Sequence, residues 1–219
     1  MKHHLLNNEE VPVKLHEDDL GAHMVYSRLT RLGKGQQRLD DSDIRLSKLQ
    51  LAGFASEKKA SLVIRGVWPK ALHACECAPF GTTKLGKLRS KCARATHGPK
   101  ASLNPLLENT VSFKTITEPF IYISKKRITA ARRFCAKNPS CALRYLCKAS
   151  TPKLDVRRCR GPADHLSWTF SQIKWKMEPN GTITRPSGLK LHVIDSPKAL
   201  LFADLENDWM TNVVRDVKH

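Results

Sequence analysis

"TTKLGKLRSKCARATHG", residues 82–98, decides the fold of this chain because it predicts an amphipathic helix with defined ends. Thr82 stands where a helix cap is expected, and Gly98 stands where a helix would end. Between them, basic residues recur at three- and four-residue intervals and so share one helical face. They are Lys84, Lys87, Lys91 and Arg94. We therefore expect a helical fold with a basic surface.

The flanking segments predict more helices of this kind. Apolar residues at helical spacing favour helices over residues 39–53, 56–78, 117–139 and 140–150. We expect the first to begin at Asp40, Asp41 or Ser42, and the second to be kinked or broken at Pro69. In the 117–139 helix, the residues expected to face a core are Phe120, Ile121, Ile128, Ala131 and Phe134. Those expected mostly to face solvent are Lys125, Lys126, Arg127, Arg132 and Arg133.

The two ends of the chain carry strand signals. Short apolar and β-branched runs at residues 11–15 and 22–29 favour a small hairpin, with the acidic "HEDD" of residues 16–19 between them. Beyond residue 150, the pattern favours a helix, a β-hairpin and a last helix. Asn180-Gly181 predicts a two-residue hairpin turn. Ser196-Pro197 predicts the start of the last helix.

Together these patterns predict an α+β fold that is mainly helical. We expect three parts: an N-terminal β-hairpin over residues 1–35, a basic helical domain over residues 36–150, and a small α+β segment over residues 151–219. The glycines of "RLGKGQQ", residues 31–37, are expected to form a turn between the first two parts.

Charge is the strongest global signal. The chain has 38 Lys and Arg residues against 20 Asp and Glu residues, a formal net charge of +18. Residues 36–150 hold 22 of the basic and 7 of the acidic residues, so this segment alone carries +15. Such an excess favours a polyanionic partner, because Lys and Arg side chains that bind phosphates release condensed counterions. A solvated basic surface without a ligand is the alternative.

Sequence features also bear on the compartment. No apolar run approaches the roughly 18 residues that span a bilayer, and the start lacks the apolar stretch of a secretory signal. Seven cysteines, an odd number, favour reduced thiols over a closed disulfide framework. We expect an intracellular protein with no membrane partner, and the sequence leaves nucleus and cytoplasm both open.

The sequence contains no motif that would supply catalytic chemistry. Residues 81–88, "GTTKLGKL", have the spacing of a phosphate-binding loop, but Leu88 stands where a hydroxyl should hold Mg²⁺. Cys75 and Cys77 are too close together for a zinc knuckle, and the remaining cysteines are too far apart in sequence. We therefore expect no catalytic residue, metal site or cofactor in this chain.

Four segments carry a resemblance to a known family: "DDLGAHM" (residues 18–24), "GVWPKALHACECAPFGTTKLGKLRSKCARATHG" (66–98), "GPADHLSWTFSQIKWKMEP" (161–179) and "SPKALLFADLENDWMTNVV" (196–214). In this order they resemble the region after the catalytic palm in reverse transcriptases of non-LTR retroelements, as in protist genomes. The thumb of that family carries an apolar-Pro-x-Ala-Leu-aromatic-Gly-x-Glu signature. Here it reads Trp68 to Glu76, and His73 and Ala74 depart from the usual Tyr-Gly.

The resemblance also bears on the acidic residues near the N-terminus. In that family an acidic residue and Leu-Gly open a hairpin at the end of the palm, whereas the metal-binding aspartates lie upstream, two of them in an aromatic-x-Asp-Asp turn. Here no aromatic residue precedes Asp18-Asp19 at residues 15–17. We expect Glu17, Asp18 and Asp19 to be turn-forming or solvated carboxylates. Mg²⁺ and the two-metal centre of nucleotidyl transfer are then expected only with an upstream palm.

The resemblance implies a fragment of an RNA-directed DNA polymerase that lacks the palm and holds an RNA–DNA or DNA duplex. The expected phosphate contacts come from Lys84, Lys87, Lys91, Arg94, Lys125, Lys126, Arg127, Arg132 and Arg133. The expected primer-grip-like hairpin comprises Gly21, Ala22, His23, Met24, Val25 and Tyr26. A missing palm domain is a further expected partner. The alternatives are a non-catalytic RNA- or protein-binding module derived from a retroelement, and a pseudogene product.

Overall fold

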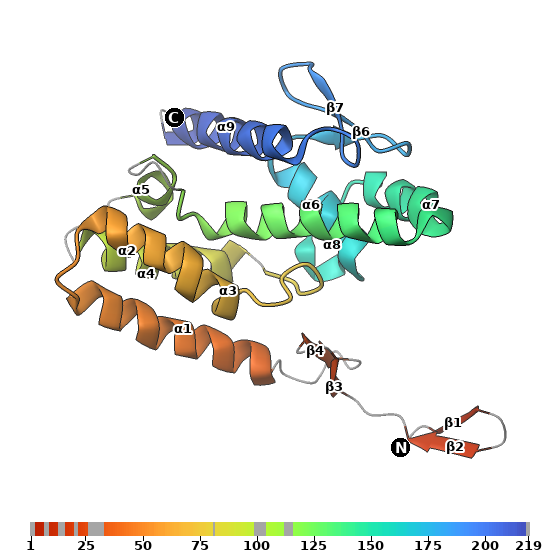
Figure 1. Ribbon diagram of the computed structural model, residues 1–219, viewed down its shortest axis with the longest axis horizontal. Coiled ribbons are helices and arrows are strands. Elements are labelled where there is room, and N and C mark those ends of the chain that lie inside the picture. Colours follow the sequence, from red (N-terminus) through yellow and green to blue (C-terminus); the bar gives the residue numbers. More distant parts are fainter. Residues whose placement is uncertain are drawn as a thin grey trace.

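Helix α6 (Pro119–Lys137) runs through the middle of the molecule in the computed structural model (Figure 1). The structure describes residues 3–6, 9–12, 16–19, 22–25, 33–80, 82–98, 104–111 and 116–217. The other helices are α1 (Gly33–Leu51), α2 (Ser56–Leu62), α3 (Trp68–Ala71), α4 (Thr82–His97), α5 (Pro105–Val111), α7 (Pro139–Ser150), α8 (Pro162–Gln172) and α9 (Lys198–Val217). The fold is mainly helical, as predicted, with a small antiparallel sheet near the C-terminus.

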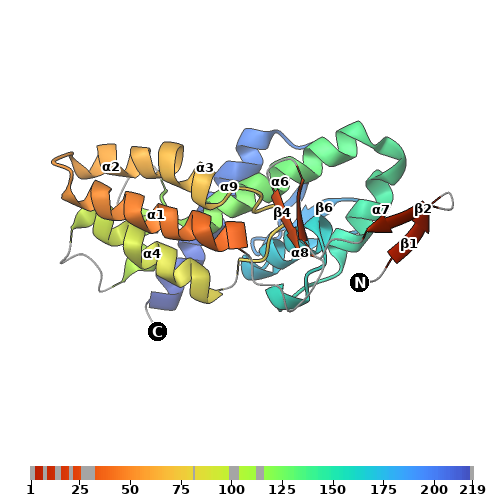
Figure 2. The same ribbon diagram turned by 90° about the horizontal axis from the view of Figure 1, so that it is seen from below.

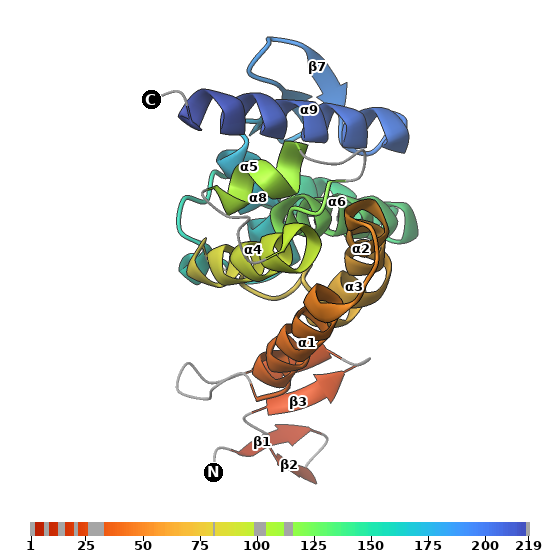
Figure 3. The ribbon, with the colours of Figure 1, turned by 90° about the vertical axis from the view of Figure 1, so that its left-hand side faces the viewer.

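The helices form layers around α6. Helix α1 lies on one side of α6 and α9 on the other (Figures 1 and 3), with α4, α5 and α8 between them. One buried core runs from Leu46 in α1 to Leu205 in α9 and so continues across residue 150. At its centre, the Phe120 ring stacks on Trp209 at 4.4 Å between centroids and meets the edge of Trp168 at 6.0 Å. Within the described residues, no helix has the length and apolar character needed to cross a bilayer.

A buried ion pair fixes the start of α6. Pro119 occupies the first turn, where its missing N–H costs nothing. Glu118 caps the helix by accepting a hydrogen bond from the backbone N–H of Phe120. The same carboxylate receives two hydrogen bonds of 2.7 Å from the Arg89 guanidinium. Because Arg89 belongs to α4, this bidentate pair joins the two helices.

Two of the predicted helix boundaries need correction. Helix α1 begins at Gly33, so the glycines of residues 31–37 do not provide the expected turn, and Ser42 is a buried residue within the helix rather than its cap. Pro69 does not break its helix, because a π-helical turn η1 (Val63–Val67) precedes it. The N–H of Trp68 bonds to Val63 O, and the chain stays helical from Ser56 to Ala71. Helix α4 has the predicted bounds, and Gly98 takes a positive φ of 94° after it.

The C-terminal sheet has the order β5 (Lys176–Met177), β6 (Thr182–Thr184), β7 (Lys190–His192). The predicted hairpin is present, but its turn is a three-residue loop, not the expected two-residue Asn-Gly turn. A two-residue type I′ turn needs positive φ at both positions, and only Gly181 has it, at 90°. Pro179 suits the start of an ordinary turn, which is closed by a hydrogen bond from Gly181 N to Glu178 O. A Cβ at Gly181 would lie 2.9 Å from His192 Nε2.

An ion cluster attaches the sheet to α9. Arg185 lies 2.7 Å from an Asp204 oxygen and 2.8 Å from an Asp208 oxygen. The indole N–H of Trp175 donates to the same Asp208 carboxylate at 2.7 Å. Burial alone would raise the pKa of Asp208, but the hydrogen bonds from Arg185 and Trp175 outweigh it, so this pKa lies below its ordinary value.

This depressed pKa predicts a pH-dependent contribution to stability. A carboxyl whose pKa is lower in the folded state stabilises the fold above its unfolded pKa, about 3.9, and loses that contribution as the pH falls through the folded pKa. Asp208→Asn should therefore lower the free energy of unfolding by about 2 kcal/mol at pH 7. It should also weaken the dependence of that free energy on pH below about 5. Urea unfolding between pH 7 and pH 2 measures both.

Glu206→Gln is the matched control on the same helix. Glu206 pairs with Lys125, but both side chains are about 30 % exposed, so we expect a loss below about 1 kcal/mol. Equal losses for Asp208→Asn and Glu206→Gln at pH 7 would show that the cluster at Arg185 does not anchor the sheet.

The N-terminal described segments are two short antiparallel strand pairs. Strand β1 (His3–Leu6) pairs with β2 (Glu9–Pro12), and β3 (His16–Asp19) pairs with β4 (Ala22–Val25). The acidic stretch of residues 16–19 is therefore a strand and not a turn. The alternative expectation, that its carboxylates are solvated, stays a prediction. The residues Gly21 and Tyr26 of the expected primer-grip-like hairpin lie outside the described residues, and the role of this hairpin stays a prediction.

Candidate nucleic-acid interface

The basic residues predicted on α4 lie on one side of that helix. Lys87, Lys91 and Arg94 are exposed, and Lys84 is half-buried. The opposite face is buried and includes Leu85, Leu88 and Cys92. Lys91 forms an ion pair with Asp43 of α1. Lys87 and Arg94 therefore offer the most accessible positive charge on α4.

Arg127 is a correction to the predicted set of phosphate contacts. Its side chain is 1 % exposed, because it shares a helical face with Phe120 and Ala131. The guanidinium donates to Cys75 O at 3.1 Å, Ala78 O at 3.1 Å, Thr169 Oγ1 at 3.0 Å and His165 O at 3.3 Å. Burial lowers its pKa to about 10, so it still carries its charge at neutral pH. Arg127 joins α6 to α8 and to the segment after α3, and has no route to an external phosphate.

Two other residues of α6 are also held within the protein. Arg132 is half-buried and donates to Val193 O and Ser196 O, both at 2.8 Å. Lys125 pairs with Glu206 of α9. The two remaining predicted contacts, Lys126 and Arg133, are seven residues apart and exposed on one face of α6.

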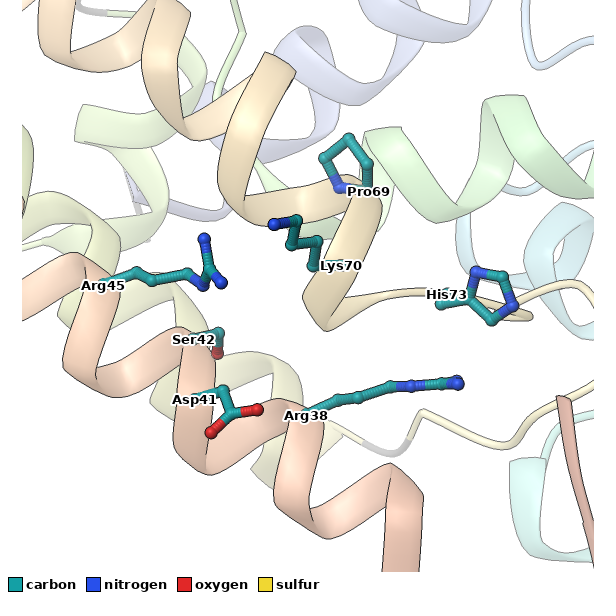
Figure 4. A pocket seen from close by; sticks show the side chains of 7 residues that line it. All are labelled: Arg38, Asp41, Ser42, Arg45, Pro69, Lys70 and His73. Atoms are coloured by element: carbon teal, nitrogen blue, oxygen red, sulfur yellow. The ribbon is translucent and has the colours of Figure 1, made fainter. Parts of the chain in front are cut away.

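A hollow between α1 and α3 brings together basic residues that the sequence did not single out. We call it the α1–α3 hollow; its volume is about 290 Å³ (Figure 4). It is lined by Arg38, Asp41, Ser42, Arg45, Pro69, Lys70 and His73. The first four recur at the three- and four-residue spacing of one face of α1. The other three come from α3 and the residues after it, where the helix continues through Pro69 because of the π-helical turn.

Cationic side chains from the two sides of this hollow face one another. Figure 4 shows Arg45 and Lys70 reaching toward each other from the two helices, and Arg38 extending toward His73. Within the described residues, neither Arg45 nor Lys70 has a carboxylate partner in an ion pair. Asp41 is the one carboxylate among the lining residues. Two facing cations repel, and an anion placed between them would stabilise both.

This arrangement suits a phosphate oxyanion. Arg45 offers a planar fork of donors and Lys70 a point charge, the two ways in which proteins bind phosphate. The Ser42 hydroxyl is already used, because it donates to Leu39 O at 2.6 Å. Within the described residues, no group of three or more His, Cys, Asp or Glu side chains could hold a metal ion.

The sequence could have indicated only part of this site. Arg38 and Arg45 are seven residues apart and so share one face of any helix that contains them. Lys70 lies in α3 and is separated in the sequence from Arg45 by the end of α1 and by α2. Only the packing of α3 on α1 places it opposite Arg45.

No protein-family model, curated protein or solved structure matches this chain. The function of the basic surface therefore has to follow from its own geometry and charge.

Proposed function

We propose that this chain holds a nucleic-acid duplex through contacts to the phosphate backbone. The proposal rests on two cations, Arg45 and Lys70, that face each other across the α1–α3 hollow. Neither forms an ion pair with a carboxylate in the part of the chain that the structure describes. The net charge of +18 makes a polyanion the natural ligand. Phosphate contacts of this kind fix the position of a duplex without reading its sequence.

A second set of exposed charges extends the surface. Helix α1 lies between α2–α3 and α4 (Figure 2), so the hollow is on one side of α1 and the basic face of α4 on the other. Lys87 and Arg94 supply the α4 charges. A duplex presents phosphates along two strands, and a surface with two separate groups of cations can contact more than one of them.

We further propose that the chain acts as the palm-end, thumb and following region of a non-LTR reverse transcriptase. The signature that carries this resemblance, Trp68 to Glu76, includes three residues of the α1–α3 hollow: Pro69, Lys70 and His73. In a complete polymerase, an upstream palm would supply the catalytic carboxylates and their Mg²⁺ ions. The role of this chain would be to hold the primer–template duplex.

The double variant Arg45→Gln/Lys70→Gln tests the proposal. Each replacement removes one phosphate contact, so we expect the affinity for a 20-base-pair DNA duplex to fall by about tenfold at low salt. Fluorescence anisotropy with the full 219-residue chain measures it. Arg144→Gln/Lys176→Gln is the matched control, because both residues are exposed and lie in α7 and β5.

Two results would contradict the proposal. One is an equal loss of affinity in the Arg45→Gln/Lys70→Gln and control variants, which would indicate a general effect of net charge. The other is that an acidic protein displaces the labelled duplex at a lower concentration than unlabelled duplex does. That result would favour the protein-binding module.

A further inference from the structure

Two further hollows lie among residues of α6, α7 and α8 and the segment that joins α7 to α8. Helix α7 lies at the C-terminal end of α6, away from α1 (Figure 1). The first, here called the aromatic hollow, has a volume of about 400 Å³. Its apolar wall includes Ala130 and Phe134 of α6, Tyr145 of α7, and Ala163 of α8. The Phe134 and Tyr145 rings lie 4.9 Å apart and are tilted by 34°. This volume is within the range of small-ligand sites in proteins.

Phe134 departs from its expected place in the core and lines the aromatic hollow instead. The sequence predicts a buried Phe134, but its side chain is 38 % exposed and faces this hollow. Tyr145 beside it is half-buried. An open apolar wall with two aromatic rings offers flat faces on which another ring can stack.

The second hollow, here called the basic hollow, has a volume of about 670 Å³. It is lined by Lys153, Arg157, Arg158, Arg160 and Asp164, around the 3-10 turn η2 (Val156–Arg158). Arg160 lines both hollows, so they adjoin. Lys148 adds a cation at the aromatic hollow.

Cations exceed carboxylates across the two hollows. Five cationic side chains line them, namely Lys148, Lys153, Arg157, Arg158 and Arg160, against two carboxylates, Glu76 and Asp164. Asp155 pairs with Arg157 and Arg158 but does not line either hollow. The excess of positive charge therefore favours an anionic ligand with a flat apolar part.

We propose that the aromatic and basic hollows together bind a single-stranded nucleic acid, with an unpaired base against Phe134 and Tyr145 and neighbouring phosphates at Arg157, Arg158 and Arg160. Stacking on aromatic side chains beside a basic groove is the general way in which proteins bind single strands. Bases in a duplex already stack on one another and cannot insert into the aromatic hollow. The site is thus distinct from the duplex surface at Arg45 and Lys70.

The first test compares two single strands that differ only in their bases. A twelve-nucleotide oligothymidylate and an abasic deoxyribose-phosphate strand of equal length carry the same phosphates. We expect the full chain to bind oligothymidylate about tenfold more tightly, because only that strand can stack. Equal affinities for the two strands, or no binding of either, would overturn the proposal.

The second test uses Phe134→Leu, which keeps an apolar side chain of similar bulk but removes the stacking face. We expect it to remove most of the preference for oligothymidylate over the abasic strand and to leave duplex affinity unchanged. Phe54→Leu is the matched control, because Phe54 is also an exposed aromatic residue, in the connection after α1. Equal effects of the two substitutions on the preference would overturn the proposal.

Two further measurements keep the test independent of folding defects and of the duplex site. Photo-cross-linking of the unmodified chain to 5-iodouracil in the same strand should place the adduct on Phe134 or Tyr145, and an adduct confined to other residues would count against the site. Arg45→Gln/Lys70→Gln should weaken duplex binding and keep the base preference. The last outcome concerns competition for the labelled oligothymidylate. If an acidic peptide with aromatic residues displaced it at a lower concentration than the unlabelled strand does, the hollows would be assigned to a protein ligand instead.

Discussion

Arg127→Met is expected to lower the free energy of unfolding by about 3–5 kcal/mol. Methionine can fill much of the space but donates no hydrogen bond. Three buried backbone carbonyls, those of Cys75, Ala78 and His165, would each lose the donor that Arg127 provides. The contact of the guanidinium with the Trp168 ring, 5.4 Å from its centroid, would be lost as well. Urea unfolding at pH 7 measures the change.

Arg133→Met is the control for this prediction. Arg133 lies on the same helix but is exposed, so we expect a change within about 0.5 kcal/mol. If Arg127→Met unfolded as late in urea as Arg133→Met while its duplex affinity fell, Arg127 would be a phosphate ligand after all.

Trp68→Ala is expected to cost about 3–5 kcal/mol of unfolding free energy. The Trp68 side chain is 0 % exposed, and its indole N–H donates to Thr117 O at 2.9 Å, so it connects the start of α3 to the residues before α6. The substitution would leave a cavity and an unsatisfied buried carbonyl. The urea midpoint, measured at constant slope, reports the loss.

Trp68→Phe separates the two contributions. It keeps an aromatic ring in the core but removes the N–H donor, so we expect an intermediate loss of about 1–3 kcal/mol. A Trp68→Ala variant as stable as the unmodified chain would show that Trp68 does not hold α3 to the residues before α6.

Local sequence signals predicted a helix correctly where the residues that start and end it lie within the same segment. Helix α4 is the clearest case, since its apolar face, its start at Thr82 and its glycine after His97 are all encoded within one segment. Helix α1 was predicted to start too late, because Gly33 and Gly35 suggested a turn. Pro69 was predicted to kink or break a helix; the helix is not broken there, because a π-helical turn precedes Pro69.

The burial of Arg127 and the make-up of the candidate sites depended on information that no single segment contains. Arg127 was assigned to solvent on the general rule that arginine is seldom buried, but carbonyl acceptors from residues 75, 78 and 165 make its burial tolerable. Lys70 meets Arg45 only because α3 packs on α1, and Tyr145 meets Phe134 only because α7 turns back on α6. Contacts between separate helices follow from packing, which hydrophobic spacing alone does not specify.

The salt dependence of duplex binding shows whether the α1–α3 hollow contacts phosphates. The dissociation constant for a DNA duplex would be measured between about 50 and 200 mM salt, for the unmodified chain and for Arg45→Gln/Lys70→Gln. We predict a linear fall of log affinity with log salt in both, with a slope smaller by about 2 in the double variant, one for each phosphate contact removed. An affinity independent of salt, or identical slopes for the two proteins, would contradict phosphate binding at the α1–α3 hollow.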